Sequence, residues 1–334
     1  MRAVVVIGTR AGRFGGAGRL GACGAAARVR RLLDGLRCEV LADPAPAALA
    51  AACRAAGAGA VLVAVGGDGT VNRLLGVASA LHVPLAVVPA GTANDLAAGL
   101  GIPARWEEAA AAVRGARTRR MDLLCVNGVR FATCGGLGVA ADAALRVQRW
   151  RASGGPAARL CRALGPAAYP LAAAREFAGA PRGHRLTVGT GEVAWRARVM
   201  CLLVGNQPRL GASFEVFPGA RNDDGLLDAC LMAAPGGRAR RFWILARTLR
   251  GEADRLPEVS RLRCARLVVE TEAPARFFGD GELLCEGRRF EVEVLPGALE
   301  VVVPAELPLR SGAAEPEGAA RAEAAAAGAR GGAE

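Results

Sequence analysis

Three turns along the chain combine glycine with acidic side chains and are suited to chemistry on phosphate groups. The first, GGDGT at residues 66–70, follows the apolar run 61–65 and precedes a predicted helix. Glycines at a strand-to-helix turn let backbone N–H groups approach a phosphate closely, and the helix N-terminus favours its negative charge. Asp68 would repel that phosphate unless a divalent cation lay between them. A purely structural turn is the alternative interpretation.

The second turn lies within PAGTANDL at residues 89–96, which also follows an apolar strand and opens a predicted helix. In a parallel sheet both turns lie at the carboxyl ends of strands, the edge where ligands bind. Thr92 and Asn94 offer hydrogen bonds to a nucleotide phosphate, and Asp95 could join Asp68 around an ion. Ordinary helix N-capping by these side chains is the alternative.

The third turn, within FFGDGE at residues 277–282, carries two carboxylates, Asp280 and Glu282. Asp-Gly is common in hairpin turns, so this hexapeptide taken alone favours a structural turn.

Hydrophobic patterning divides the chain into two regions with different predicted architectures. The first region alternates apolar strands with helices, which predicts a parallel sheet buried on both faces. Its expected strands are 3–7, 38–41, 60–65 and 84–88, and its expected helices are 22–36, 47–56, 71–81 and one beginning near 93.

From residue 121 onward most segments are typical of strands, and many alternate apolar and polar residues, which predicts a mainly antiparallel region. Its expected strands are 123–126, 129–133, 185–188, 194–204, 227–232, 266–271, 290–295 and 299–303, with a tight turn at Pro296-Gly297 and helical insertions at 140–177 and 238–249. We therefore expect an α/β domain over residues 1–122, an antiparallel domain over 123–304 and a disordered Ala/Gly/Glu tail over 305–334.

The composition favours an anionic partner. The 334 residues carry a formal net charge of +12, with short arginine-rich runs at 28–31, 117–120 and 238–241. Nucleotides, nucleic acid and anionic lipid all fit this charge, but no aromatic stacking platform or reading motif supports nucleic acid. Solvated surface is the simpler interpretation of each run.

Other features point to a cytoplasmic protein without metal-cluster or histidine chemistry. The ten cysteines are scattered without a C-x-x-C pair, which is typical of reduced thiols in an intracellular protein. His82 and His184 lack the neighbours that a metal cluster or a nucleophile–base pair requires. The N-terminus is typical of a buried strand rather than a signal peptide, and no segment is predicted to span a membrane.

Five motifs together resemble the diacylglycerol kinase catalytic family, which includes bacterial lipid kinases, sphingosine kinases and ceramide kinases. The motifs, in the order and spacing of that family, are GGDGTVN at 66–72, PAGTANDLA at 89–97, VGNQ at 204–207, DDGLLD at 223–228 and GDGE at 279–282. The resemblance covers residues 1–304. It implies an N-terminal α/β domain similar to that of NAD kinase and phosphofructokinase, a C-terminal β-sandwich, and ATP and lipid meeting in the cleft between them.

The resemblance also implies roles for individual residues. Asp68 and Asp95 match the family's acidic, water and magnesium network, and either Glu282 or Asp280 matches the catalytic base. A structural magnesium ion would bind the Asp224 carboxylate and the backbone carbonyls of Arg221 and Leu226, with a turn cap by Asp224 as the alternative. The ATP-binding positions would be Gly66, Gly67, Asp68, Gly69, Thr70, Val71, Asn72 and Thr92, and Asn94 is added from its place in the second turn.

Three positions depart from the family pattern. The first loop reads Gly8-Thr9-Arg10-Ala11-Gly12 where the family has a sequence close to Asn-Pro-x-Ser-Gly. Arg73 stands where the family has Glu, and a threonine expected near residues 41–43 is absent. These differences bear on nucleotide affinity or rate more than on fold.

The expected function is that of an ATP- and Mg²⁺-dependent lipid kinase of phospholipid metabolism. NAD kinase, which shares GGDGT, and a catalytically weak nucleotide- or lipid-binding homologue are the alternatives. The acceptor lipid would be met at the inner face of a membrane, where the arginine runs would hold the protein peripherally on anionic lipid. No short motif selects among diacylglycerol, sphingoid base, ceramide and phosphatidylglycerol, and formation of a homodimer stays open.

Overall fold

The protein is described by a computed structural model over residues 2–9, 22–115, 117–179, 183–190, 194–210, 214–235 and 237–305. The predicted tail beyond residue 305 and residues 10–12 of the first loop lie outside these ranges. The chain forms two compact units, one running to Asp122 and resuming at Gly297, the other comprising Leu123–Pro296.

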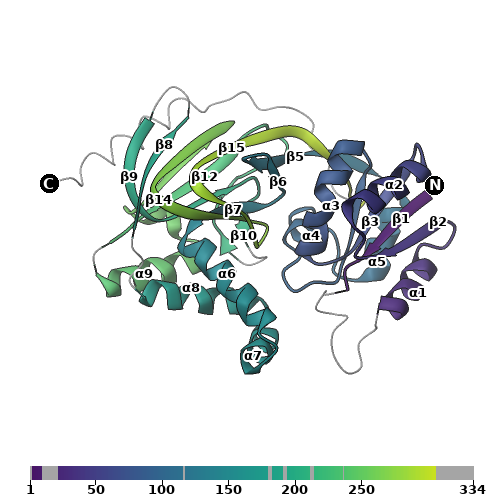
Figure 1. The fold of residues 1–334 in the computed structure, drawn as a ribbon, viewed down its shortest axis with the longest axis horizontal. Coiled ribbons are helices and arrows are strands. Elements are labelled where there is room, and N and C mark those ends of the chain that lie inside the picture. The colour runs from purple at the N-terminus through teal and green to yellow at the C-terminus, as the bar shows by residue number, and fades with distance from the viewer. Residues whose placement is uncertain are drawn as a thin grey trace. The chain divides into compact units, whose positions relative to one another are not determined.

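The first unit is a parallel sheet with helices on both faces (Figure 1). Four strands pair in parallel in the order β2-β1-β3-β4. Helices α2 and α3 contact each other, as do α1 and α5. The elements are β1 (Arg2–Ile7), α1 (Ala22–Leu32), β2 (Arg37–Ala42), α2 (Pro46–Ala56), β3 (Ala60–Gly66), α3 (Asp68–Leu81), β4 (Leu85–Pro89), α4 (Asp95–Gly99) and α5 (Trp106–Gly115).

The central strands of this sheet are wholly apolar and wholly buried. Every residue of β3 and of β4 is buried, as expected for parallel strands covered on both faces. This confirms the α/β architecture predicted for the first region. Helix α5 was not predicted, although Trp106, Ala109, Ala110 and Val113 form its buried face at helical spacing. Four consecutive alanines within this short segment weaken that signal.

The second unit is mainly antiparallel, as predicted, with its helices covering one face of a sheet (Figure 1). Its strands are β5 (Thr118–Val126, whose first five residues belong to the first unit), β6 (Val129–Phe131), β7 (Cys134–Gly138), β8 (His184–Gly189), β9 (Ala194–Gly205), β10 (Arg209–Leu210), β11 (Phe214–Glu215), β12 (Leu227–Ala233), β13 (Val259–Cys264), β14 (Arg266–Gly279) and β15 (Glu282–Val302). Its helices are α6 (Val139–Ala152), α7 (Pro156–Leu164), η1 (Gly165–Ala167), α8 (Ala168–Ala178), α9 (Arg238–Leu249) and η2 (Ala253–Arg255).

Strands β7 and β8 connect two parts of this sandwich. Each pairs with β9 on one side and with β14 on the other. Along β12, Leu227, Ala229 and Leu231 face the core between the strands, whereas Cys230 and Met232 face the core beneath the helices. This period of two is the pleat of a strand that is buried on both sides.

The predicted turn at Pro296-Gly297 is wrong. Strand β15 continues through it, pairs antiparallel with β14, and at Val301 pairs in parallel with Leu85 of β4. The segment does not fold back because it finds a partner in the first unit. There Gly297, with φ 58°, donates its N–H to the buried carboxylate of Asp122 at 2.7 Å. Residues 297–304, which we assigned to the second domain, therefore belong to the first unit.

Within the described ranges, every helix is too short or too polar to cross a lipid bilayer.

Candidate active site

The GGDGT turn lies at the carboxyl end of β3 and leads directly into α3, which begins at Asp68. The hydroxyl of Thr70 is buried against Gly8 and Gly66, where a Cβ atom on either glycine would overlap it. Thr70 therefore joins the end of β1 to the end of β3. The glycines are required by packing as well as by any ligand.

The two glycine turns of the first unit touch each other. Gly66 pairs with Pro89 across β3 and β4, so the turns leave the sheet side by side. A Cβ atom on Gly67 would lie 2.8 Å from the Cα atom of Gly91. The backbones are thus in contact, and both turns present N–H groups at the same edge of the sheet.

The carboxylate of Asp68 holds this pair of turns together. Its Oδ2 atom accepts the N–H of Asn94 at 2.9 Å, and its Oδ1 atom accepts the N–H of Asp95 at 2.6 Å. The side chain of Asn94 accepts the N–H of Gly91 at 2.9 Å and donates to its carbonyl at 3.1 Å. The Asp68 carboxylate therefore lies beside the backbone of Asp95. A carboxylate has about four acceptor positions, so Asp68 can accept these two N–H groups and still bind a hydrated magnesium ion. The residue types at Asp68 and Asp95 thus fit that ion.

The predicted nucleotide-binding residues divide into two groups by exposure. Gly66, Thr70 and Val71 are buried and shape the turn, and the side chain of Asn94 is engaged with Gly91. The positions that reach the surface, partly or fully, are Gly67, Asp68, Gly69, Asn72 and Thr92.

Arg73, one of the departures from the family pattern, forms an ion pair with Asp43. Its Nη2 atom lies 2.5 Å from Asp43 Oδ1, and its Nε atom donates to the Gly69 carbonyl at 3.2 Å. Asp43 also accepts the backbone N–H of Thr9 at 3.0 Å and the Thr9 hydroxyl. Burial raises the pKa of the Asp43 carboxyl, but these hydrogen bonds outweigh it and hold that pKa below its usual range. The reversed charge at Arg73 is therefore balanced locally.

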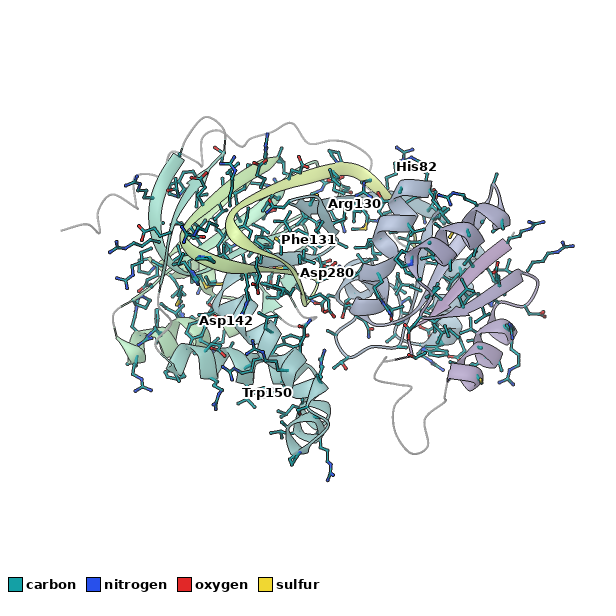
Figure 2. The ribbon with its side chains drawn as sticks, in the orientation of Figure 1. His82, Arg130, Phe131, Asp142, Trp150 and Asp280 are labelled. Carbon is teal, nitrogen blue, oxygen red and sulfur yellow. The ribbon has the colours of Figure 1, made fainter. Side chains whose placement is uncertain are left out.

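In the second unit, Asp280 fixes the turn between β14 and β15. It has a left-handed backbone, with φ 51°, and its carboxylate accepts the N–H groups of Ala132 and Thr133, each at 2.9 Å. The Thr133 hydroxyl donates to the same carboxylate at 2.7 Å. Figure 2 shows Asp280 close to Phe131, which precedes these donors. Asp280 therefore anchors the turn to the segment after β6.

Glu282, two residues further on, is exposed. Its carboxylate contacts a helix, whereas that of Asp280 contacts the loop after β6. Its Oε2 atom accepts a hydrogen bond from Nε2 of Gln148 on α6 at 2.5 Å, and the same nitrogen donates to the Gly281 carbonyl at 3.0 Å. Gln148 was not predicted, because nothing in its local sequence distinguishes it from any surface glutamine. Its contact with Glu282 spans more than 130 residues.

Comparison with known proteins agrees with this geometry. Residues 3–126 match the model of the diacylglycerol kinase catalytic domain, and residues 138–303 match that of the YegS C-terminal NAD kinase beta sandwich-like domain. The chain belongs to the diacylglycerol kinase catalytic family. It is accordingly an enzyme of the kinase class.

Named relatives support the assignment, and a solved structure shares the fold. The chain is 34% identical over 260 residues to a Pseudomonas aeruginosa protein named "Probable lipid kinase YegS-like", covering 75% of this chain and 78% of the relative. It is 32% identical over 268 residues to a Mycobacterium tuberculosis diacylglycerol kinase, covering 77% and 80%. A diacylglycerol kinase structure from Bacillus anthracis matches 91% of this chain and 97% of its own, with a TM-score of 0.69 at 21% identity, which shows a shared fold.

At the predicted structural magnesium site of this kinase, an arginine side chain of the second unit pairs with the carboxylate that would bind the metal. The Asp224 side chain is 3% exposed, forms an ion pair with the Arg263 guanidinium and accepts the N–H of Leu226 at 3.1 Å. Arg221 pairs with Asp223 at 2.9 Å. A magnesium ion beside Asp224 would be repelled by Arg263, so the residues as arranged do not fit the metal. The arrangement favours the alternative of a turn cap by Asp224.

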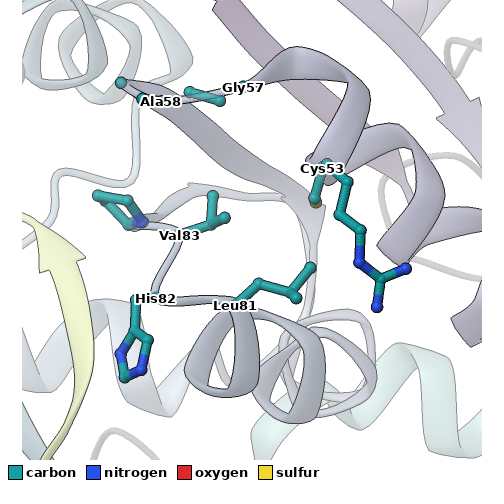
Figure 3. A pocket seen from close by; sticks show the side chains of 10 residues that line it. Cys53, Gly57, Ala58, Leu81, His82 and Val83 are labelled. Atoms are coloured by element: carbon teal, nitrogen blue, oxygen red, sulfur yellow. The ribbon is translucent and has the colours of Figure 1, made fainter.

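A shallow hollow of the kinase's first unit lies away from these turns. Cys53, Gly57, Leu81 and His82 help to line it (Figure 3), and Ala60 and Pro84 place it at the amino ends of β3 and β4. The glycine turns are at the carboxyl ends of the same strands. The hollow therefore does not belong to the candidate site.

Proposed function

We propose that this kinase transfers the γ-phosphoryl group of ATP to the hydroxyl group of a membrane lipid, of the diacylglycerol or sphingoid kind. The observation that carries the proposal is the pair of touching glycine turns at the carboxyl ends of β3 and β4, held by Asp68. Backbone N–H groups at the start of the 14-residue helix α3 favour a polyphosphate there.

The nucleotide is assigned to the first unit on both packing and charge. Close contact between Gly67 and Gly91 leaves backbone, without side chains, at the surface that a phosphate would approach. Thr92 and Asn72 lie in the same two turns and supply polar side chains. Magnesium, held through Asp68 and Asp95, would supply positive charge that neutralises the phosphates.

Glu282 is assigned the role of general base, which accepts the proton of the lipid hydroxyl. An exposed carboxylate with a fixed orientation suits a general base, whereas Asp280 already accepts three hydrogen bonds from the segment after β6. As the lipid oxygen forms its bond to the γ-phosphorus, the bond from that phosphorus to the ADP oxygen breaks and the proton moves to Glu282. Such a base contributes about 10²- to 10⁴-fold to the rate.

A lipid-panel assay tests the proposal. The purified protein is incubated with γ-labelled ATP, Mg²⁺ and detergent-dispersed diacylglycerol, sphingosine, ceramide or phosphatidylglycerol, with NAD in a separate reaction. We expect label in one lipid class and no NADP. Formation of NADP, or ATP binding without a labelled lipid from any class, contradicts the proposal.

A further inference from the structure

Helices α6, α8 and α9 lie on one face of the sheet in the second unit, and α7 packs against α6 further from the sheet (Figure 1). Helix α6 contacts α7 and α8, and α8 contacts α9. Ile244 and Leu245 of α9 and Phe177 of α8 are buried in the core between this layer and the strands. We call the exposed surface of α7, α8 and α9 the outer helical face.

Large apolar side chains are concentrated on the outer helical face. Six large hydrophobic side chains are exposed among the described residues, and four of them lie on α7, α8 and α9. They are Leu160 at 55%, Leu171 at 45%, Phe242 at 42% and Trp243 at 41% exposure. Single exposed apolar residues need no explanation, but their concentration on the helices of this one unit indicates an interaction surface.

The same face is basic. Arg159, Arg175 and Arg238 are exposed on α7, α8 and α9, and Arg250 follows α9. Glu176 is the one acidic residue in the sequences of these three helices, and it is paired with Arg146 of α6. Arg175 is four residues after Leu171, and Phe242 is four residues after Arg238, so each pair shares a helix face.

The Trp243 ring lies close to two guanidinium groups. The Arg240 guanidinium lies 4.1 Å from the centroid of its ring and that of Arg247 lies 5.3 Å away. Each arginine is in turn fixed by an acidic residue, Glu258 at 2.6 Å and Glu252 at 2.9 Å. An exposed tryptophan with a fixed orientation and cationic neighbours is suited to the boundary between lipid headgroups and acyl chains.

We propose that the outer helical face docks on an anionic lipid bilayer, with Phe242 and Trp243 entering the headgroup boundary and Arg159, Arg175 and Arg238 contacting lipid phosphates. The proposal rests on the proposed function, because a lipid hydroxyl must be reached from a bilayer surface. Apolar side chains that protrude between arginines match a surface that is anionic outside and apolar beneath. A second copy of this face would bring like charges together.

Vesicle sedimentation without ATP tests docking separately from catalysis. We expect the protein to bind phosphatidylcholine vesicles that contain phosphatidylglycerol, to bind pure phosphatidylcholine weakly, and to be released by salt. Replacing Phe242 and Trp243 together by serine should weaken binding at least about tenfold, and Arg238→Ala about fivefold. Val129→Ser and Arg288→Ala, exposed positions of the second unit outside these helices, are matched controls that should not change it.

A second measurement uses a variant that keeps the apolar surface. Vesicles with brominated acyl chains should quench the fluorescence of the wild-type protein, and Trp243→Phe should bind equally but lose most of that quenching. Equal binding by the double serine variant, or unchanged quenching in Trp243→Phe, overturns the proposal. So does binding only to soluble acidic protein or nucleic acid. Transfer to a short-chain lipid dispersed as monomers should be unaffected by these variants, so its absence in all proteins indicates failure of the proposed function instead.

Discussion

The two units each contain a Gly-Asp-Gly turn, and the aspartate makes the same kind of backbone contact in both. Asp68 accepts the consecutive backbone N–H groups of residues 94 and 95, and Asp280 accepts those of residues 132 and 133. The turns differ two residues after the aspartate, where Thr70 is buried and Glu282 is exposed. The comparison therefore separates the carboxylates of Asp68 and Asp280, which hold turns together, from the exposed carboxylate of Glu282, which is positioned to take up a proton.

The largest expected effect follows from replacing the exposed carboxylate. Glu282→Gln keeps the shape of the side chain and can still hydrogen bond to Gln148, but it cannot take up a proton. We expect kcat for lipid phosphorylation to fall about 10²- to 10⁴-fold with an unchanged melting temperature. Glu286→Gln is the control and should leave kcat unchanged, because Glu286 lies on the same strand as Glu282 but forms an exposed ion pair with Arg276 of β14.

Replacing Asp280, which holds the turn of the second unit, should act mainly through stability. In Asp280→Asn one accepted N–H would face an amide NH₂ group, which costs about 1–3 kcal/mol of unfolding free energy. Asp68→Asn should lose stability to a similar extent and should also lower kcat, because Asp68 holds magnesium in the proposed site. Asp34→Asn, at an exposed position, should cost less stability. Denaturant unfolding measures these differences. An Asp280→Asn protein of unchanged stability that loses as much kcat as Glu282→Gln would make Asp280 the reacting carboxylate.

Two glycine-to-alanine variants test whether the touching turns bind ATP. In Gly67→Ala the new Cβ atom would lie 2.8 Å from the Gly91 Cα atom, so the turns must separate. We expect ATP affinity to fall at least about tenfold, which corresponds to about 1.4 kcal/mol. Gly76→Ala on α3, where a Cβ atom meets nothing within 4 Å, should leave affinity unchanged and raise stability by about 0.4–1 kcal/mol. Equal ATP affinity in both variants contradicts this role.

The smallest expected effect concerns the Asp43–Arg73 pair, in which the Arg73 side chain is half exposed. A double-mutant cycle with Asp43→Asn and Arg73→Ala should give a coupling energy of about 0.2–1 kcal/mol at pH 7. Because the folded-state pKa of Asp43 is below its unfolded value, this stabilisation is present above about pH 4 and is lost as the pH falls through the folded pKa. A coupling that persists unchanged at low pH contradicts the ion pair.

The sequence was sufficient for the architecture where each segment carries its own pattern. The buried strands β1, β3 and β4 and the helix Arg238–Leu249 were predicted within two residues, because apolar runs and amphipathic spacing are local signals. Strand β7 was not predicted, since its sequence CGGLG has little strand propensity. It needs glycine because a Cβ atom on Gly136 would overlap the Leu202 carbonyl of β9.

The candidate site was predictable only in its motifs. The GGDGT, PAGTAND and GDGE segments identified Asp68, Asn94, Asp95, Asp280 and Glu282. Their partners Thr133, Gln148 and Arg263 were not identified, because each contact joins segments far apart in the chain and no local pattern marks them. The continuation of β15 through Gly297 was missed for the same reason, since its partner β4 lies some 200 residues earlier.

The central claim is that ATP is held by the first unit and the proton is taken by Glu282 of the second. Calorimetric titration of ATP with Mg²⁺ into wild-type, Glu282→Gln and Gly67→Ala proteins tests this division most directly. The account predicts equal Kd values for wild type and Glu282→Gln, and a Kd at least about tenfold higher for Gly67→Ala. A Kd raised by Glu282→Gln and unchanged by Gly67→Ala would contradict it.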